Sequence, residues 1–384
     1  MPRWRNWQTH RLQVPAVATL CRFESGSRHH HLTEETIMFD VFLGFAFLAS
    51  ATIANKYALS ALSLSLMVGL RMLGAGIILL FFYKKSERLH FNYIKQDWLV
   101  LIGVSLLTML IPALFKAYAL KKMFASKAAF LASLDPFVTA LYSYFFWHER
   151  LTKKKVAGII LGFMGTLILL ISSSGTEQEL IAWSIFSYPE IAALLAMAIG
   201  RLGWMFVQQL LRKERYTAPE LNGILMTMSG ILAFITPFFV LFFSQLLGSI
   251  PFIKTYITPY SYHDTMQFLH IGTGTGINMG LIFFAVAYTI FMGNVVGYTM
   301  YANFLKRHSA TFVALAGFSV PLYVYFFSAV LLGEPLSVNF LIASLVTFIG
   351  LLIFYQDEIN KLSNDRLHPW QWIKRKVIYT SKNT

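Results

Sequence analysis

Charged side chains interrupt three otherwise apolar stretches of this sequence. Arg71, Asp135 and Arg201 each lie near the middle of such a stretch. In lipid, an ionised residue at the centre of a helix costs ~2.5–3.5 kcal/mol, so each of the three is a candidate for binding. Asp135 can pair with either arginine and leave a net positive centre, which would attract a carboxylate or a phosphate. The alternative is a salt bridge that only orients the helices.

Asp135 is the most informative of these residues. In the repeat described below its counterpart is Val320, so the repeated structure does not itself require an acid there. The following Pro136 lacks an N–H and leaves a backbone carbonyl free nearby. We hypothesise that Asp135 takes up a proton or faces a solute, with a static salt bridge as the alternative.

A second candidate surface lies in the stretch 279–301. Asn294 and Tyr298 fall on one face of a helix together with Phe291 and Tyr301, because their spacings are three or four residues. Such a face can line a cavity. Ordinary packing, with Asn294 bonded to a neighbour, is the alternative.

Two glutamates end long apolar stretches at equivalent places. Glu149 opens the run ERLT, and Glu334 opens the run EPLS 185 positions later. We interpret both as turn or gate residues at the start of the next helix, where an acid suits the helix N-terminus. Proton uptake is the alternative role.

The two glutamates belong to a longer internal repeat. The skeleton of residues 120–165 returns at 305–350 with one constant offset and no gap. Each copy is apolar up to its glutamate, then polar, then apolar again, which is typical of two membrane helices joined by a short turn. The matched positions include Leu120 and Leu305, Pro136 and Pro321, and Gly165 and Gly350.

Composition requires a lipid environment, since 56% of the residues are hydrophobic and only 13% are charged. The formal charge of +14 suits cytoplasmic loops that face anionic lipid, so we expect no nucleic-acid partner. With one cysteine and scattered histidines we expect neither a metal nor a cofactor. Ten stretches are long enough to cross a bilayer: 39–56, 62–83, 98–119, 123–147, 155–172, 189–210, 221–246, 279–301, 308–332 and 336–355.

Loop charges predict the orientation of these spans. Lys and Arg are retained on the cytoplasmic side, and their distribution favours both termini inside. Five spans per repeat is an odd number, so the copies at 38–172 and 189–355 must be inverted relative to each other. We therefore expect an all-α integral membrane protein of two inverted five-helix repeats, with a substrate site at the midplane. This favours a secondary transporter; a membrane enzyme acting on a lipid or lipid-linked substrate is the alternative.

Three segments lie outside this repeated core. Residues 1–37 lack periodicity and are compatible with a transfer-RNA gene read as protein, so we expect translation to start at Met38 or this segment to be disordered. Residues 247–278 form a long outside loop, and residues 356–384 a basic cytoplasmic tail.

Taken together, residues 38–355 resemble the EamA-type transporters of the drug/metabolite transporter superfamily. The resemblance rests on the ten spans in two halves, on Arg71 within GLRMLGAG, and on the spacing from Pro136 to Glu149 with its second copy at Glu334. It implies export or exchange of a small polar or amphipathic metabolite across the bacterial cytoplasmic membrane, by a monomer or homodimer. No arginine of the second half matches Arg71, because the constant offset leads to Tyr256 in the long loop.

Overall fold

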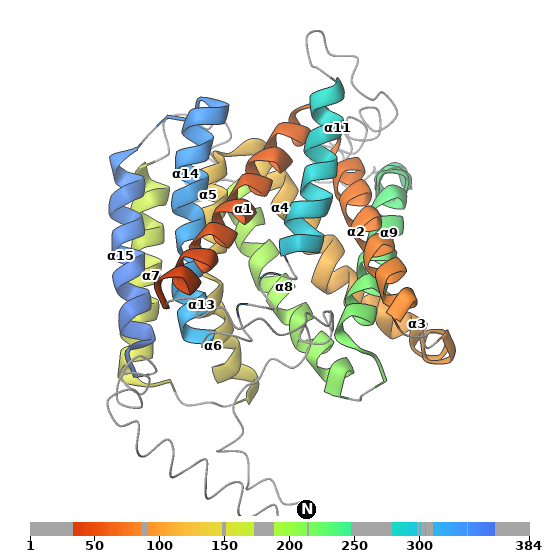
Figure 1. The fold of residues 1–384 in the computed structure, drawn as a ribbon, viewed down its shortest axis with the longest axis horizontal. Coiled ribbons are helices and arrows are strands. Elements are labelled where there is room, and N and C mark those ends of the chain that lie inside the picture. The colour runs from red at the N-terminus through yellow and green to blue at the C-terminus, as the bar shows by residue number, and fades with distance from the viewer. Residues whose placement is uncertain are drawn as a thin grey trace, which may run out of the picture.

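The chain runs back and forth through one bundle of helices in the computed structural model (Figure 1). The structure describes residues 34–86, 91–147, 151–172, 188–212, 215–246, 279–297, 300, 304, 310–335 and 337–357. Every element within them is helical, and eight helical spans are long and apolar enough to cross a membrane. This confirms the all-α membrane fold, with eight spans by length and composition where the sequence predicted ten.

The helices correspond closely to the predicted spans. The fifth predicted span is the 20-residue helix α7, and the tenth is the 17-residue apolar helix α15; neither is among the eight. In chain order the elements are α1 (Glu34–Ala61), α2 (Leu64–Ser86), α3 (Phe91–Ser105), η1 (Leu106–Leu110), α4 (Ile111–Lys122), α5 (Ala125–Ala132), α6 (Asp135–Trp147), α7 (Lys153–Ser172), α8 (Tyr188–Arg212), α9 (Ala218–Leu246), α11 (Met279–Tyr288), η3 (Thr289–Val296), α13 (Ala310–Gly317), α14 (Ser319–Leu332) and α15 (Val338–Phe354).

The duplication extends to the ends of the helices. Helices α5 and α13 begin 185 positions apart and end 185 positions apart, and the same offset relates the end of α6 to the end of α14 and the start of α7 to the start of α15. Both fourth spans are therefore broken in two at the same place. The two π-helical turns also lie at equivalent positions. The offset of 185 residues takes η1 to residues 291–295, which lie within η3. Such wide turns inside membrane helices are frequent at functional sites.

Packing between the two halves is reciprocal. Helix α2 packs against α9, its counterpart, and α7 packs against α15; these pairs stand at opposite sides of the bundle in Figure 1. The first helix of each half contacts the third and fourth spans of the other half: α1 contacts η3, α11 and α14, while α8 contacts η1, α4, α5 and α6. At the level of whole spans, an exchange of the halves would leave this set of contacts unchanged.

Close contact between α7 and α15 depends on glycine. A Cβ atom at Gly158 would lie 2.6 Å from the carbonyl oxygen of Gly350 and 2.7 Å from Cβ of Phe354. Small residues let membrane helices approach so closely that their backbones touch, which is how such helices gain packing energy in lipid.

Gly158→Ala is therefore expected to lower the stability of the bundle. The added methyl group meets backbone atoms that cannot rotate away, at a cost of ~1–3 kcal/mol. Gly103→Ala is the matched control, because no atom lies within 4 Å of its added Cβ and alanine favours the helix. Thermal unfolding in detergent should rank Gly158→Ala clearly below both the wild type and the control; equal unfolding temperatures would contradict the close contact.

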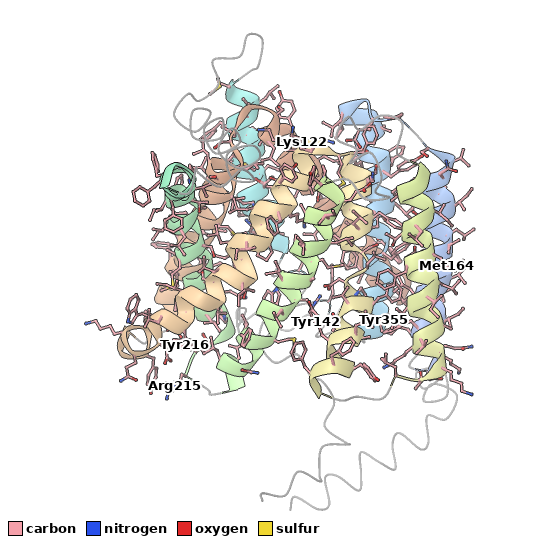
Figure 2. The ribbon with its side chains drawn as sticks, turned by 180° about the vertical axis from the view of Figure 1, so that it is seen from behind. Lys122, Tyr142, Met164, Arg215, Tyr216 and Tyr355 are labelled. Carbon is pink, nitrogen blue, oxygen red and sulfur yellow. The ribbon has the colours of Figure 1, made fainter. Side chains whose placement is uncertain are left out.

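The two ends of the bundle differ in their polar contacts. Figure 2 shows Lys122 at one end and Arg215 with Tyr216 at the other. At the latter end Asp97 of α3 accepts hydrogen bonds from the Tyr216 hydroxyl at 3.2 Å and from Arg215 Nη1 at 3.3 and 3.4 Å. Burial and the Asp97 carboxylate raise the pKa of the Tyr216 hydroxyl, so it remains a proton donor. These bonds tie α3 to the segment that precedes α9.

For most residues of the three segments outside the repeated core, the structure does not test the predictions. Residues 1–33, 247–278 and 358–384 lie outside the described part of the chain. Helix α1 begins at Glu34, within the segment expected to precede the translated protein. The start of translation at Met38 stays a prediction.

Candidate functional site

A break in the fourth span positions Asp135. Helix α5 ends at Ala132, and α6 begins at Asp135 after a two-residue turn. Pro136 explains the break, because a proline inside a continuous helix would remove a backbone bond and clash with the preceding turn. Proline is well tolerated in the first turn of a helix, where its missing N–H is not needed. Asp135 therefore lies at a partly exposed helix N-terminus within the bundle.

Arg201 of α8 pairs with Asp135. Its Nε atom donates to Asp135 Oδ1 at 2.8 Å, and its Nη2 atom forms an ion pair with Oδ2. The two-point geometry matches a planar guanidinium to a carboxylate. About a third of each side chain is exposed, 31% for Arg201 and 35% for Asp135, so the pair is accessible to solutes. The sequence left Arg71 and Arg201 open as partners of Asp135, and in the structure the partner is Arg201.

Arg71 lies elsewhere, at the contact between α2 and η3. Its carbonyl oxygen accepts a hydrogen bond from Asn294 Nδ2 at 3.5 Å. Asn294 is buried, with 7% of its surface exposed. The structure therefore brings Arg71 and Asn294 together, and separately joins Asp135 to Arg201.

Lys116 of α4 is a further charged residue in the bundle, and the sequence did not single it out. Its side chain is exposed in the structure, and α4, which carries it, packs against α2, which carries Arg71. One signal in the sequence could have found it: Arg71 is seven residues from the start of α2 and Lys116 is six from the end of α4, so antiparallel spans place them at similar depth.

The helical face proposed for the eighth span can be followed only at Phe291 and Asn294. Phe291 is 55% exposed while Asn294 is buried, so the two point in different directions. The reason is the π-helical turn η3, which has more residues per turn than the α-helix assumed in the prediction. Tyr298 and Tyr301 lie outside the described residues, and so does Glu149.

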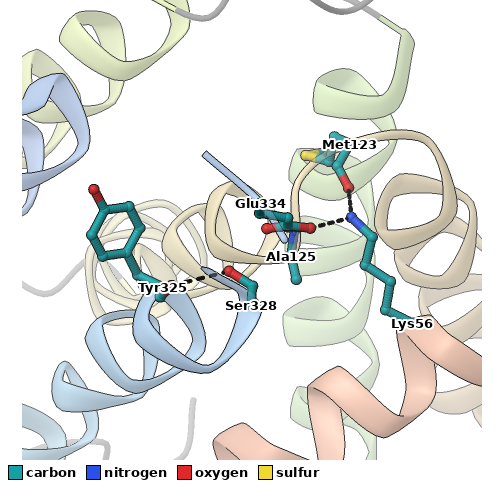
Figure 3. A network of polar contacts seen from close by, with 6 residues as sticks. All are labelled: Lys56, Met123, Ala125, Tyr325, Ser328 and Glu334. Carbon is teal, nitrogen blue, oxygen red and sulfur yellow. Dashed lines mark hydrogen bonds and ion pairs between the residues drawn. The ribbon is translucent and has the colours of Figure 1, made fainter. Parts of the chain in front are cut away.

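Glu334 forms a lock at one end of the bundle (Figure 3). Its Oε1 atom accepts from Lys56 Nζ at 2.5 Å, and its two oxygens accept from the Ala125 N–H at 2.9 and 3.0 Å. Lys56 Nζ also donates to the Met123 carbonyl at 2.6 Å. Only 8% of the Glu334 side chain and 20% of the Lys56 side chain are exposed. The lock joins α1, the start of α5 and the turn after α14.

A tight turn presents Glu334 to this lock. Gly333 has a φ of 69°, which favours glycine, and the Glu334 N–H returns to the Ser328 carbonyl at 3.2 Å. This is the usual way to end a helix with glycine. We expected a turn or gate residue whose acid suits the N-terminus of the following helix; Glu334 does lie in the turn between α14 and α15, but its carboxylate accepts from the N-terminus of α5. Because the turn directs the side chain toward α5, the carboxylate caps a helix of the other half.

Lys127 and Glu190 form the most deeply buried ion pair of the described residues. Each side chain is 3% exposed, and the pair links α5 to the first turn of α8. Both residues lie near helix ends in the sequence, where long side chains can reach the membrane surface. The two side chains meet because α5 packs against α8, a contact that the sequence does not predict.

Comparison with known sequences decides the identity of the chain. The pattern of the EamA-like transporter family matches residues 36–171 and again residues 187–356. The chain belongs to the EamA-like transporter family. The double match agrees with the internal duplication, and it makes the protein a secondary transporter of a small metabolite rather than the membrane enzyme of the alternative reading. A solved crystal structure covering 83% of this EamA-like transporter and 94% of its own chain has a TM-score of 0.52 at 17% identity, which shows the shared fold.

Several proteins named as transporters are similar to this EamA-like chain. An S-adenosylmethionine/S-adenosylhomocysteine transporter of Chlamydia muridarum is 24% identical over 332 residues, which is 85% of this chain and 94% of that one. The protein of the same name in Chlamydia trachomatis is 23% identical over 84% of this chain and 90% of its own. A probable amino-acid metabolite efflux pump of Salmonella typhimurium is 25% identical over 60% of this chain and 67% of that protein.

Proposed function

We propose that this EamA-like transporter carries S-adenosylmethionine and S-adenosylhomocysteine across the bacterial cytoplasmic membrane. The observation that carries the proposal is the similarity to the Chlamydia muridarum transporter over 85% of the chain. The chemistry of the site supports it. These solutes combine a carboxylate with an ammonium group, and the bundle offers both signs of charge in Arg71 and in the pair of Arg201 with Asp135.

We further propose that the two halves are inverted repeats of five spans with both termini in the cytoplasm. The reciprocal contacts between the halves support this arrangement. Inverted halves supply two similar conformations, each open to one side of the membrane. Transport then follows from alternation between them, with the solute held between the two fourth spans.

In this mechanism Glu334 closes the outer end. The lock with Lys56 and Ala125 joins the halves there. Since Glu149 and Ala310 are the counterparts of Glu334 and Ala125 at the repeat offset, we propose that Glu149 caps α13 in the opposite conformation and closes the inner end. Glu334 and Glu149 would then act in turn.

Counterflow in proteoliposomes tests the proposed function. Vesicles preloaded with S-adenosylhomocysteine should take up labelled S-adenosylmethionine with saturable kinetics and accumulate it transiently above the outside concentration. Protein-free vesicles and vesicles loaded with methionine are the controls. Uptake that does not saturate, or that does not depend on the internal solute, would refute exchange of these compounds.

Asp135→Asn tests whether the Asp135 carboxyl takes part in proton uptake or solute binding. The amide keeps the size of the side chain but loses the charge that Arg201 binds, so we expect exchange to fall about tenfold and its dependence on pH to flatten. Asp97→Asn is the matched control, because it removes the carboxylate of another Asp–Arg pair, at the end of the bundle. If Asp135→Asn keeps the wild-type rate and pH profile, the pair is only structural.

A further inference from the structure

The lock at Glu334 is a carboxylate-binding site in which the protein supplies its own carboxylate. The donors belong to the first half: Lys56 Nζ lies 2.5 Å from Oε1, and the Ala125 N–H donates to both oxygens at 2.9 and 3.0 Å (Figure 3). The acceptor belongs to the second half, in the turn between α14 and α15. Opening this end of the bundle requires Glu334 to leave all three contacts.

The donors are held in place by contacts within the first half. Lys56 of α1 donates to the Met123 carbonyl at the end of α4, at 2.6 Å. In return Lys121 of α4 donates to the Leu62 carbonyl just after the end of α1, at 3.2 Å. Lysine side chains commonly bind the last carbonyls of a helix in this way. Because neither contact involves Glu334, both can persist after its carboxylate has left.

The vacated site would be strongly attractive to an anion. Only 20% of the Lys56 side chain is exposed, so water replaces its carboxylate poorly. The N-terminus of α5 adds its partial positive charge and the Ala125 N–H. The other lysine in the first turn of α5, Lys127, is paired with Glu190. Departure of Glu334 is therefore unfavourable unless a second carboxylate takes its place.

We propose that the carboxylate of the solute takes the place of Glu334 on Lys56 and the Ala125 N–H when the outer end opens. The identity of the solute and the side of the membrane rest on the proposed function, whereas the carboxylate site rests on the contacts of the lock. Binding is thereby coupled to opening. The eight residues of α5 put about 12 Å of helix between this site and Asp135, too far for one amino-acid group to reach both. The lock is accordingly an entry site.

Acetate tests the carboxylate site without any assumption about the solute. Glu334→Ala removes a methylene and a carboxylate, which are the heavy atoms of acetate. Acetate should therefore bind in the vacated place and recover about half of the unfolding temperature that the substitution loses in detergent. Acetamide and chloride at equal concentration should not, and neither the wild type nor Glu334→Ala with Lys56→Gln should respond. A folded Glu334→Ala variant that responds equally to acetate and chloride overturns the site.

Transport measurements test the assignment to the solute. Decarboxylated S-adenosylmethionine lacks only the carboxylate, so the wild type should have a KM about tenfold higher for it than for S-adenosylmethionine. Lys56→Gln should raise the KM for S-adenosylmethionine to a similar value without raising that for the decarboxylated compound, while Lys56→Arg should retain the preference. Glu334→Gln should raise neither KM, because it removes only the competing carboxylate. Lys154→Gln, in an exposed ion pair, is the control for lost charge.

The outcomes separate the two proposals. If the wild type carries both compounds with equal KM, or if Lys56→Gln weakens both equally, the inference fails while the proposed function stands. The wild-type comparison decides this even where a variant does not fold. If the wild type carries neither compound, the proposed function fails, and the response to acetate alone decides whether the lock accepts a free carboxylate.

Discussion

Glu190→Gln is expected to destabilise the protein by ~3–5 kcal/mol, because it leaves the Lys127 ammonium group buried without its carboxylate. Both side chains are 3% exposed, so water cannot replace the lost partner. Unfolding of the purified protein in detergent, followed by intrinsic fluorescence, should show the largest loss of stability of any single substitution proposed for the ion pairs.

Two controls make this expectation specific. Lys154→Met breaks a pair whose side chains are 44% and 41% exposed, and exposed pairs contribute ~0–1 kcal/mol. The double variant Lys127→Met with Glu190→Met removes both charges, and apolar replacement of a whole buried pair is often neutral. A Glu190→Gln variant as stable as Lys154→Met would mean that the two buried charges do not depend on each other.

Glu334→Gln is expected to slow exchange on the order of 100-fold. The amide loses the ion pair with Lys56 and weakens the cap on α5, and removal of a buried charged partner costs about 3 kcal/mol in the closed state, which corresponds to that factor in population. Labelled counterflow at saturating solute measures the rate. Because the solute site is untouched, the affinity of the open state should change little.

A double-mutant comparison distinguishes a gate from a merely stabilising contact. Lys56→Gln should slow exchange as Glu334→Gln does, and the double variant should be no slower than either, since both act on one lock. Asp357→Asn, in the exposed pair at Lys154, should exchange at the wild-type rate. Independent effects of Lys56→Gln and Glu334→Gln would show that the two residues do not close the same end.

Much of the fold was readable from the sequence because repetition and hydropathy are local properties of the chain. The constant offset found between 120–165 and 305–350 recurs in the ends of α5 and α13 and of α6 and α14. The proline after Asp135 marked the point where the fourth span breaks. An acid and an arginine at similar depth predicted a pair, and Asp135 does pair with Arg201.

The rest depended on how each helix is rotated and which helix lies beside it. Hydropathy gives neither quantity when a helix is apolar on every face. The sequence therefore did not predict that the Glu334 carboxylate would bind the N-terminus of α5, a helix of the other half, or that Lys127 would pair with Glu190. The wide turn η3 changed the register after residue 289 and separated Phe291 from Asn294.

The reciprocal packing has a consequence for biogenesis. Helix α1 packs on α14, and Lys56 meets Glu334, a residue synthesised 278 positions later. At ribosomal speeds of about 5–20 residues per second, the first helix spends on the order of tens of seconds in the bilayer before its partner exists. During that interval Lys56 can already reach the Met123 carbonyl of its own half, but its carboxylate partner does not yet exist. The Lys56–Glu334 ion pair, and with it the closed outer end, can therefore form only after most of the second half has been synthesised.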